Sequence, residues 1–280
     1  MDSLCDNCVT GERLSGSPRG SILTSTSPLS SYYSPLSTET KPKRAIVVIT
    51  DIFGLSIDNP MVIADILGEK CAADVWVPDI FKGNPLVNLK GIEFPYADVP
   101  GQQLTPEQEA KKNAVLGSVR ERVGEFPPDK QDPEIADFIR HIRQEHGYEK
   151  IGVVGARKTN NVHRYCWGGG NAIRVAAMGN NIIDSIAAVH PSHNVQDPIT
   201  KVKIPIGFFI PEDDIAWDRD FAQKIKQEWA TSPDAPRHLF KDYLGVTHGF
   251  GSRPNLAIPQ VKTAWEALTN DLVAWLNDTL

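Results

Sequence analysis

Short apolar runs alternate with amphipathic helical segments along most of this chain, and this alternation restricts the possible folds more than any other feature. The runs at residues 45–50 (AIVVIT), 151–154 (IGVV) and 185–190 (SIAAVH) are typical of strands that are buried on both faces of a parallel sheet. Amphipathic helical periods occur between and after such runs, as at residues 132–146 and 259–280. This alternation predicts a mainly parallel sheet with helices on both faces.

The other elements follow from the same criteria. Further strands are expected at residues 74–78, 204–210 and 237–243, and further helices at residues 60–71, 169–178, 218–229 and from 105 onward. Thr105 is followed by Pro106 and, three residues on, by Gln108, which is the pattern of a helix capping box. Residues 83–104 show no period and are expected to form a long loop.

The first part of the chain differs in composition from the rest. Residues 15–40 contain many Ser and Thr together with three prolines, and they show no strand or helix period. We therefore predict a partly irregular N-terminal arm over residues 1–43 and one α/β domain over residues 44–280.

Charge and hydropathy exclude several classes of function. The net charge of −6 argues against nucleic acid or an anionic membrane as the main partner, because both select for clustered Lys and Arg. The sequence has no run of 18 apolar residues, and residues 1–14 hold no apolar stretch of the length of a secretory signal. We therefore expect a cytoplasmic protein that does not cross a membrane.

Four cysteines are spread along the chain: Cys5, Cys8, Cys71 and Cys166. In a cytoplasmic protein they are expected to be reduced thiols rather than a disulfide framework. Cys5 and Cys8 form a C-x-x-C pair, but a zinc site of four cysteines would need a second pair. Two thiols in the arm are the simpler interpretation, and a redox or metal role for the pair is the alternative.

Cys166 lies where a nucleophile would be expected. Residues 164–170 (RYCWGGG) come between the strand expected at 151–154 and the helix expected at 169–178. A nucleophile elbow needs a strand, a sharp turn and a closely packed helix, and the glycines after Cys166 permit close packing. The partial positive charge at a helix N-terminus also favours a thiolate. Alone, the motif also fits a buried cysteine with a packing role.

An acid and a histidine follow Cys166 in the chain order of the α/β hydrolases. Asp213 and Asp214 follow the strand expected at 204–210, and Asp214 is the preferred orienting acid, with Asp213 as the alternative. His248 stands in a glycine-lined loop (VTHGF) before the last helix. His190 lies at the end of an apolar run, where a histidine can either line the pocket or have a structural role.

Together these segments resemble the dienelactone hydrolase family. The resemblance rests on Cys-Trp-Gly-Gly at residues 166–169, Asp-Ile-Phe-Gly at 51–54 and His-Gly-Phe at 248–250, and it spans nearly the whole chain. The N-terminal C-x-x-C-V-T-G and the VPD-x-F-x-G at residues 77–83 are similar to the fungal branch. The resemblance implies an α/β-hydrolase fold and the hydrolysis of small ester or lactone substrates without a cofactor. No metal is expected, and a monomer and a homodimer are both compatible with the sequence.

The same resemblance implies a role for each site residue. Cys166 would attack the carbonyl, His248 would transfer the proton and Asp214 would hold His248. The backbone N–H groups of Ile52 and Trp167 would form the oxyanion hole. Acyl transfer to a thiol divides one difficult step into two easier ones, and fixed N–H donors stabilise the oxyanion.

One departure from the family pattern falls in the elbow itself. The family has Gly two residues before the nucleophile, where this chain has Arg164. Deleting residues 156–164 would join the strand and elbow as IGVVG-YCWGGG. These nine residues are interpreted as an insert, either real or the product of a gene-model error. The alternative to an active hydrolase is therefore a family member whose catalysis the insert impairs.

Two further departures concern substrate binding. Asp51 stands where the family often has a Glu that contacts the nucleophile, so Asp51 is a candidate supporting residue. The bacterial lactone hydrolases place an Arg after the VPD strand, where this chain has Phe81-Lys82-Gly83. Arg253 is a candidate to supply the positive charge instead.

Overall fold

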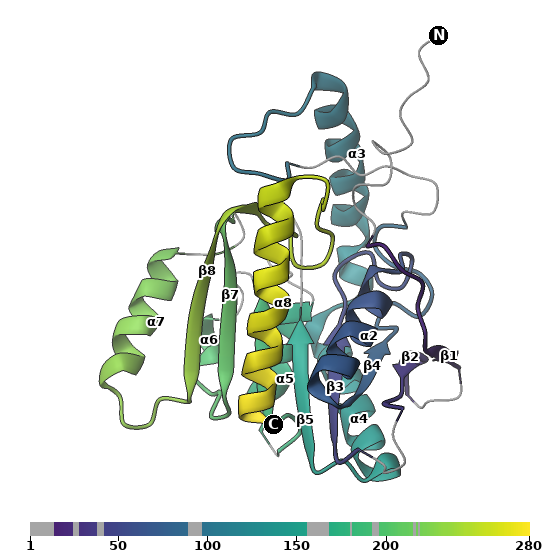
Figure 1. The fold of residues 1–280 in the computed structure, drawn as a ribbon, viewed down its shortest axis with the longest axis vertical. Coiled ribbons are helices and arrows are strands. Elements are labelled where there is room, and N and C mark those ends of the chain that lie inside the picture. The colour runs from purple at the N-terminus through teal and green to yellow at the C-terminus, as the bar shows by residue number, and fades with distance from the viewer. Residues whose placement is uncertain are drawn as a thin grey trace.

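The structure, a computed structural model, describes residues 14–24, 28–37, 42–88, 97–155, 168–179, 181–191, 196–214, 217 and 219–280 (Figure 1). Its strands are β1 (Ser21–Leu23), β2 (Ser31–Ser34), β3 (Arg44–Ile49), β4 (Asp74–Pro78), β5 (Lys150–Gly155), β6 (Ser185–Val189), β7 (Ile206–Asp213) and β8 (His238–Thr247). Its helices are α2 (Asn59–Cys71), α3 (Pro106–Arg122), the 3-10 helix η1 (Val123–Glu125), α4 (Pro128–His146), α5 (Gly168–Ala177), α6 (Gln196–Ile199), α7 (Arg219–Thr231) and α8 (Pro259–Thr279).

The described strands form one eight-stranded sheet in the order β1-β2-β4-β3-β5-β6-β7-β8. All neighbours from β4 to β8 pair in parallel, and β1 and β2 pair antiparallel at one edge. Helices α2 and α8 cover one face, and α3, α4, α5 and α7 pack on the other (Figure 1). The mainly parallel sheet with helices on both faces is therefore confirmed.

The apolar runs become strands because both sheet faces are covered. In β3, Ile46 and Val48 point toward α2 and α8, whereas Val47 and Ile49 point toward the opposite layer. Successive residues of β3 face opposite apolar layers, so every residue from Ala45 to Ile49 needs an apolar side chain. This accounts for the unbroken apolar run.

Local capping signals set helix ends that the sequence had indicated. The Thr105 side chain accepts a hydrogen bond from the Gln108 N–H at 3.2 Å, and the Gln108 side chain accepts one from the Thr105 N–H at 2.9 Å. Helix α4 begins at Pro128, four residues before its predicted start, and ends at His146. The next residue, Gly147, has a φ of 70°, the left-handed conformation that glycine favours.

The described part of the N-terminal arm contains two strands, Ser21–Leu23 and Ser31–Ser34, where the sequence shows no strand period. Strand β2 pairs antiparallel with β4 in the register Tyr32↔Val77, and β1 pairs with β2. Tyr32 Oη donates to Asp65 Oδ1 of α2 at 2.7 Å and accepts from Gly20 N at 2.6 Å. These bonds join residues far apart in the sequence, so no local pattern could reveal them.

The carboxyl ends of β3, β5, β6, β7 and β8 meet at one edge of the sheet, the edge to which the β5 arrow points in Figure 1. Open α/β sheets place their ligand sites at this edge.

Candidate active site

A buried histidine and a buried carboxylate are hydrogen-bonded at this edge. His248, directly after β8, lies with Nδ1 2.6 Å from Oδ1 of Asp214, which directly follows β7. Because a carboxylate only accepts, Nδ1 is the donor, and this bond fixes the tautomer and the plane of the ring. The side chain of Asp214 is fully buried and that of His248 is 6% exposed.

The two acids after β7 have different environments. Asp213 is exposed, and its backbone oxygen accepts a hydrogen bond from the His248 N–H at 3.0 Å. The chain turn thus directs Asp214 inward while the Asp213 backbone anchors the histidine loop. Of the two candidate acids, only Asp214 contacts the His248 ring through its side chain. The other ring nitrogen, His248 Nε2, is buried and has no hydrogen-bond partner among the described residues.

Asp51 lies at the end of β3 within a second buried polar cluster. Its Oδ1 accepts a hydrogen bond from Phe53 N at 3.1 Å, which tightens the turn that contains Ile52. Its Oδ2 accepts from Ser252 Oγ at 3.1 Å and lies 3.5 Å from Nε of Arg253. The structure therefore brings Asp51 and Arg253 together as a buried ion pair.

The Arg253 side chain is completely buried. Its guanidinium carbon lies 4.2 Å from the centre of the Phe53 ring, a cation–π distance. The Arg253 N–H also bonds the Gly249 oxygen at 3.0 Å, which folds the segment after His248 back on itself. Arg253 thus joins the histidine loop to the turn after β3.

Asn59, the first residue of α2, extends this cluster to the arm. Its Nδ2 donates to Ser252 O at 3.0 Å, and its Oδ1 accepts from Leu14 N at 3.1 Å. The start of α2, the histidine loop and the arm are therefore bonded through one side chain.

The two sides of the predicted elbow are in direct contact. A Cβ added at Gly155, the last residue of β5, would lie 2.3 Å from the carbonyl carbon of Gly168, the first residue of α5. A Cβ at Gly169 would lie 3.4 Å from Gly155 O and from Pro191 Cβ. This close approach of strand and helix is what the glycines after a nucleophile permit.

His190 connects this contact to His248. It precedes Pro191, it is completely buried, and its φ of 37° is an uncommon backbone conformation for a residue other than glycine. Its ring lies edge-on against the His248 ring, with 4.7 Å between centroids. The start of α5, the end of β6 and the His248–Asp214 pair are therefore contiguous.

Of the two residues predicted to form the oxyanion hole, Ile52 is described. It is fully buried in the turn after β3, and its carbonyl accepts a hydrogen bond from Val87 N at 3.1 Å. Lys82, which stands where the bacterial lactone hydrolases have an Arg, lies at the surface, and its Nζ is 2.7 Å from Glu134 Oε1. Cys166, Trp167, the insert at 156–164, Cys5 and Cys8 lie outside the described residues.

Ser252, Asn59 and the His190 contact were not identified from the sequence. Ser252 has the clearest signal, because it directly precedes the candidate Arg253, whereas Asn59 resembles any polar residue at a helix start. The part of the chain that the structure describes holds no group of three or more His, Cys, Asp or Glu side chains suited to a metal ion. None of its helices is long and apolar enough to span a membrane.

Comparison with known proteins identifies the family of the chain. The sequence pattern of the dienelactone hydrolase family matches residues 32–280. The chain is 27% identical to the hydrolase tropI of Talaromyces stipitatus over 276 residues, covering 97% of this chain and 94% of that protein. It is 26% identical to the human carboxymethylenebutenolidase homolog, covering 84% of this chain and 82% of that protein.

Solved structures show the same fold. The dienelactone hydrolase of Anabaena variabilis superposes with a TM-score of 0.53 at 12% identity, covering 95% of this chain and 100% of that chain. This likeness concerns the fold alone, and it confirms the predicted α/β-hydrolase architecture. With the match over residues 32–280, the chain belongs to the dienelactone hydrolase family and is a hydrolase of carboxylic esters or lactones.

Proposed function

We propose that the chain hydrolyses small carboxylic esters or lactones through a covalent acyl-enzyme on Cys166, with His248 as base and Asp214 as its orienting acid. The main support is the 2.6 Å bond between His248 Nδ1 and Asp214 Oδ1. It leaves Nε2 as the nitrogen that can accept the thiol proton. Cys166 precedes Gly168 by two residues, and the start of α5 lies beside Pro191 and hence His190.

In the proposed reaction, the Cys166 thiolate attacks the ester carbonyl carbon while His248 Nε2 holds the proton taken from the thiol. The tetrahedral intermediate collapses, the alkoxide leaves with that proton, and a thioester remains. Water, deprotonated by His248, then hydrolyses the thioester to the acid and regenerates the thiol. The backbone N–H groups of Ile52 and Trp167 are proposed to stabilise the oxyanion in both steps.

Asp51 and Arg253 are proposed as supporting groups. Their 3.5 Å ion pair joins the turn that contains Ile52 to the loop that contains His248. The ion pair would thus keep a fixed distance between the Ile52 N–H, the proposed oxyanion donor, and His248, the proposed base. A small-molecule substrate in the cytoplasm, without nucleic acid or membrane as partner, belongs to the same proposal.

The test is hydrolysis of p-nitrophenyl acetate by the purified chain and by Cys166→Ala, each with and without iodoacetamide. We expect the Cys166→Ala variant and the alkylated protein to lose the activity together. Cys71→Ala is the matched control, because Cys71 is buried and its burial raises the pKa of its thiol to about 11, so little thiolate forms near neutral pH. Wild-type rates from Cys166→Ala would exclude Cys166 as the nucleophile.

A second candidate function follows from the insert. Arg164 and the other residues of segment 156–164 stand in the most constrained turn of the family pattern. The second candidate is a folded chain that binds a ligand but has lost catalysis. Such a chain would show no esterase activity, and only variants that lack residues 156–164 would regain it.

A further inference from the structure

A cavity lies under the site edge of the sheet, on the face covered by α2 and α8. It contains about 450 Å³ of space that no atom fills, part of it open to solvent. Its walls are mostly apolar and come from strands and helices alike: Val48, Val154, Val189, Ile63 and Leu272. Polar groups lie mainly at one end, where Thr50, Asp51 and Ser252 contribute to the lining.

The polar end adjoins the candidate active site. Asp51 and Ser252 are bonded to each other, and Ser252 follows His248 by four residues in the same loop. Thr50 is only 2% exposed, and its Oγ1 has no hydrogen-bond partner among the described residues. Buried hydroxyl groups are nearly always bonded to something, so Thr50 Oγ1 is a group that a ligand could satisfy.

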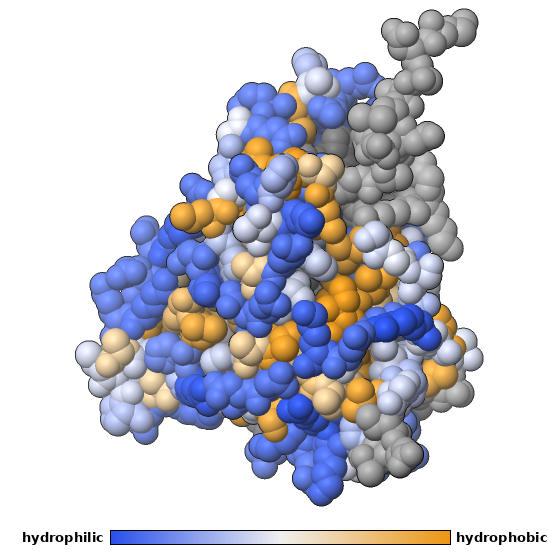
Figure 2. All heavy atoms as spheres, in the orientation of Figure 1, coloured by the Kyte–Doolittle hydropathy of each residue, from blue (hydrophilic) through white to orange (hydrophobic). Residues whose placement is uncertain are grey.

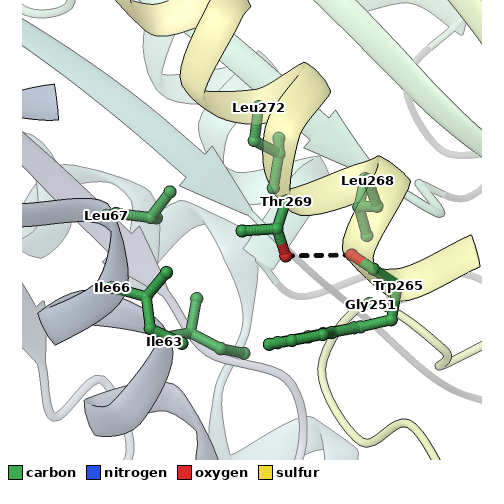
Figure 3. Close-up of a pocket in the computed structure, with 8 residues that line it drawn as sticks. All are labelled: Ile63, Ile66, Leu67, Gly251, Trp265, Leu268, Thr269 and Leu272. Atoms are coloured by element: carbon green, nitrogen blue, oxygen red, sulfur yellow. Dashed lines mark hydrogen bonds between the residues drawn. The ribbon is translucent and has the colours of Figure 1, made fainter. Parts of the chain in front are cut away.

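A groove between the two helices adjoins the cavity. Ile63, Gly251 and Leu272 line both spaces. In Figure 3, side chains of α2 and α8 face one another across the groove, and the Trp265 ring extends toward Ile63. Figure 2 shows an apolar stretch of surface between these two helices, bordered by polar side chains.

We propose that the cavity and groove bind the linear aliphatic acyl chain of an ester substrate, with the ester group at the Thr50–Asp51 end. The inference rests on the proposed esterase function. Apolar walls favour a hydrocarbon, and a space extending from the sheet edge to the helix surface fits a chain better than a compact ring. The polar end, beside the turn of Ile52 and the loop of His248, orients the chain with its carbonyl toward these groups.

The first test is the dependence of kcat/KM on acyl length. With p-nitrophenyl acetate, butyrate, octanoate and decanoate, kcat/KM should rise with chain length, because each buried methylene adds discrimination. Ile63→Trp fills the junction of cavity and groove, and it should lower the octanoate-to-acetate ratio at least about tenfold. Ile63→Ala should shift the preference toward longer chains, and it cannot overfill the site. Ala267→Phe, on the exposed face of α8, is the matched control and should leave the ratio unchanged.

A second measurement separates this inference from the proposed mechanism. Sodium decanoate is titrated by calorimetry into the full chain with Cys166→Ala, alone and combined with Ile63→Trp or Ala267→Phe. We expect binding that Ile63→Trp weakens at least about tenfold and Ala267→Phe does not. Decanoate binding without any ester hydrolysis would overturn the proposed function and leave the acyl site standing. Ester hydrolysis with no decanoate binding, and with the same chain-length profile in both Ile63 variants, would overturn the acyl site.

Discussion

The rings of His190 and His248 lie edge to face with 4.7 Å between their centroids, although the two residues follow different strands. His248 is therefore held on two sides, by Asp214 through Nδ1 and by the His190 ring through packing. A Cβ at Gly251 would lie 3.3 Å from His190 Nε2, so the absence of a side chain at Gly251 makes room for this pair.

His248→Ala should lower kcat/KM for p-nitrophenyl acetate about 10²–10⁴-fold, because it removes the proposed general base. His190→Ala should cost less, because it only removes packing against the His248 ring. The His190 loss should appear mainly in kcat, since the ring position matters in the chemical step. Equal losses, or a larger loss from His190→Ala, would contradict the assignment of His248 as the base.

Asp214→Asn should lower kcat about 10²-fold or more, because an amide can donate to Nδ1 and so favour the wrong tautomer. Asp213→Asn is the control at the adjacent, exposed position, and it should remain close to the wild-type rate. The measurement is kcat of both variants and of the wild type with the same ester substrate. A loss confined to Asp213→Asn would reverse the assignment of the acid.

Asp51→Ala should lower the free energy of unfolding by about 3–5 kcal/mol, because it removes the carboxylate from the fully buried Arg253 guanidinium. Replacing both residues, as Asp51→Leu with Arg253→Met, should recover most of that loss. Urea unfolding monitored by circular dichroism gives both values. If the single and double variants were equally unstable, the ion pair would not be the cause.

Gly155→Ala should destabilise the fold by about 1–3 kcal/mol, because its Cβ would collide with the backbone of Gly168 and push α5 away from β5. Esterase activity should fall more steeply than stability, since the same displacement moves the start of α5. Gly117→Ala in α3 is the control: its Cβ would have no neighbour within 4 Å, and the substitution should be neutral or slightly stabilising. Thermal unfolding and ester hydrolysis are measured on both variants.

Deleting residues 156–164 should raise esterase activity at least about tenfold, because an elbow without Arg164 can aim the thiol and its oxyanion donor more tightly. Thermal stability should change little or increase, since shortening a loop recovers only a small closure entropy. A deletion variant that is no more active than the full chain, or that fails to fold, would show that the segment is a working part of this protein.

The sequence by itself determined the features that depend on neighbouring residues. The Thr105 capping box and the apolar run of β3 follow from local spacing. Cys166, Asp214 and His248 are each indicated as candidates by the short segment around them. Strands buried on two faces must be apolar throughout, and helix caps need partners only three residues away, so both leave local signals. The fold class was predictable for this reason.

Only the tertiary structure decided which of several similar residues meet. Asp213 and Asp214 are the same residue type at adjacent positions, and the turn after β7 buries Asp214 and exposes Asp213. The contact of His190 with His248 and the pairing of β2 with β4 join segments that are remote in sequence. Such contacts depend on the packing of the whole sheet, because the side chains and strand edges that meet are brought together only when all the layers close around one core.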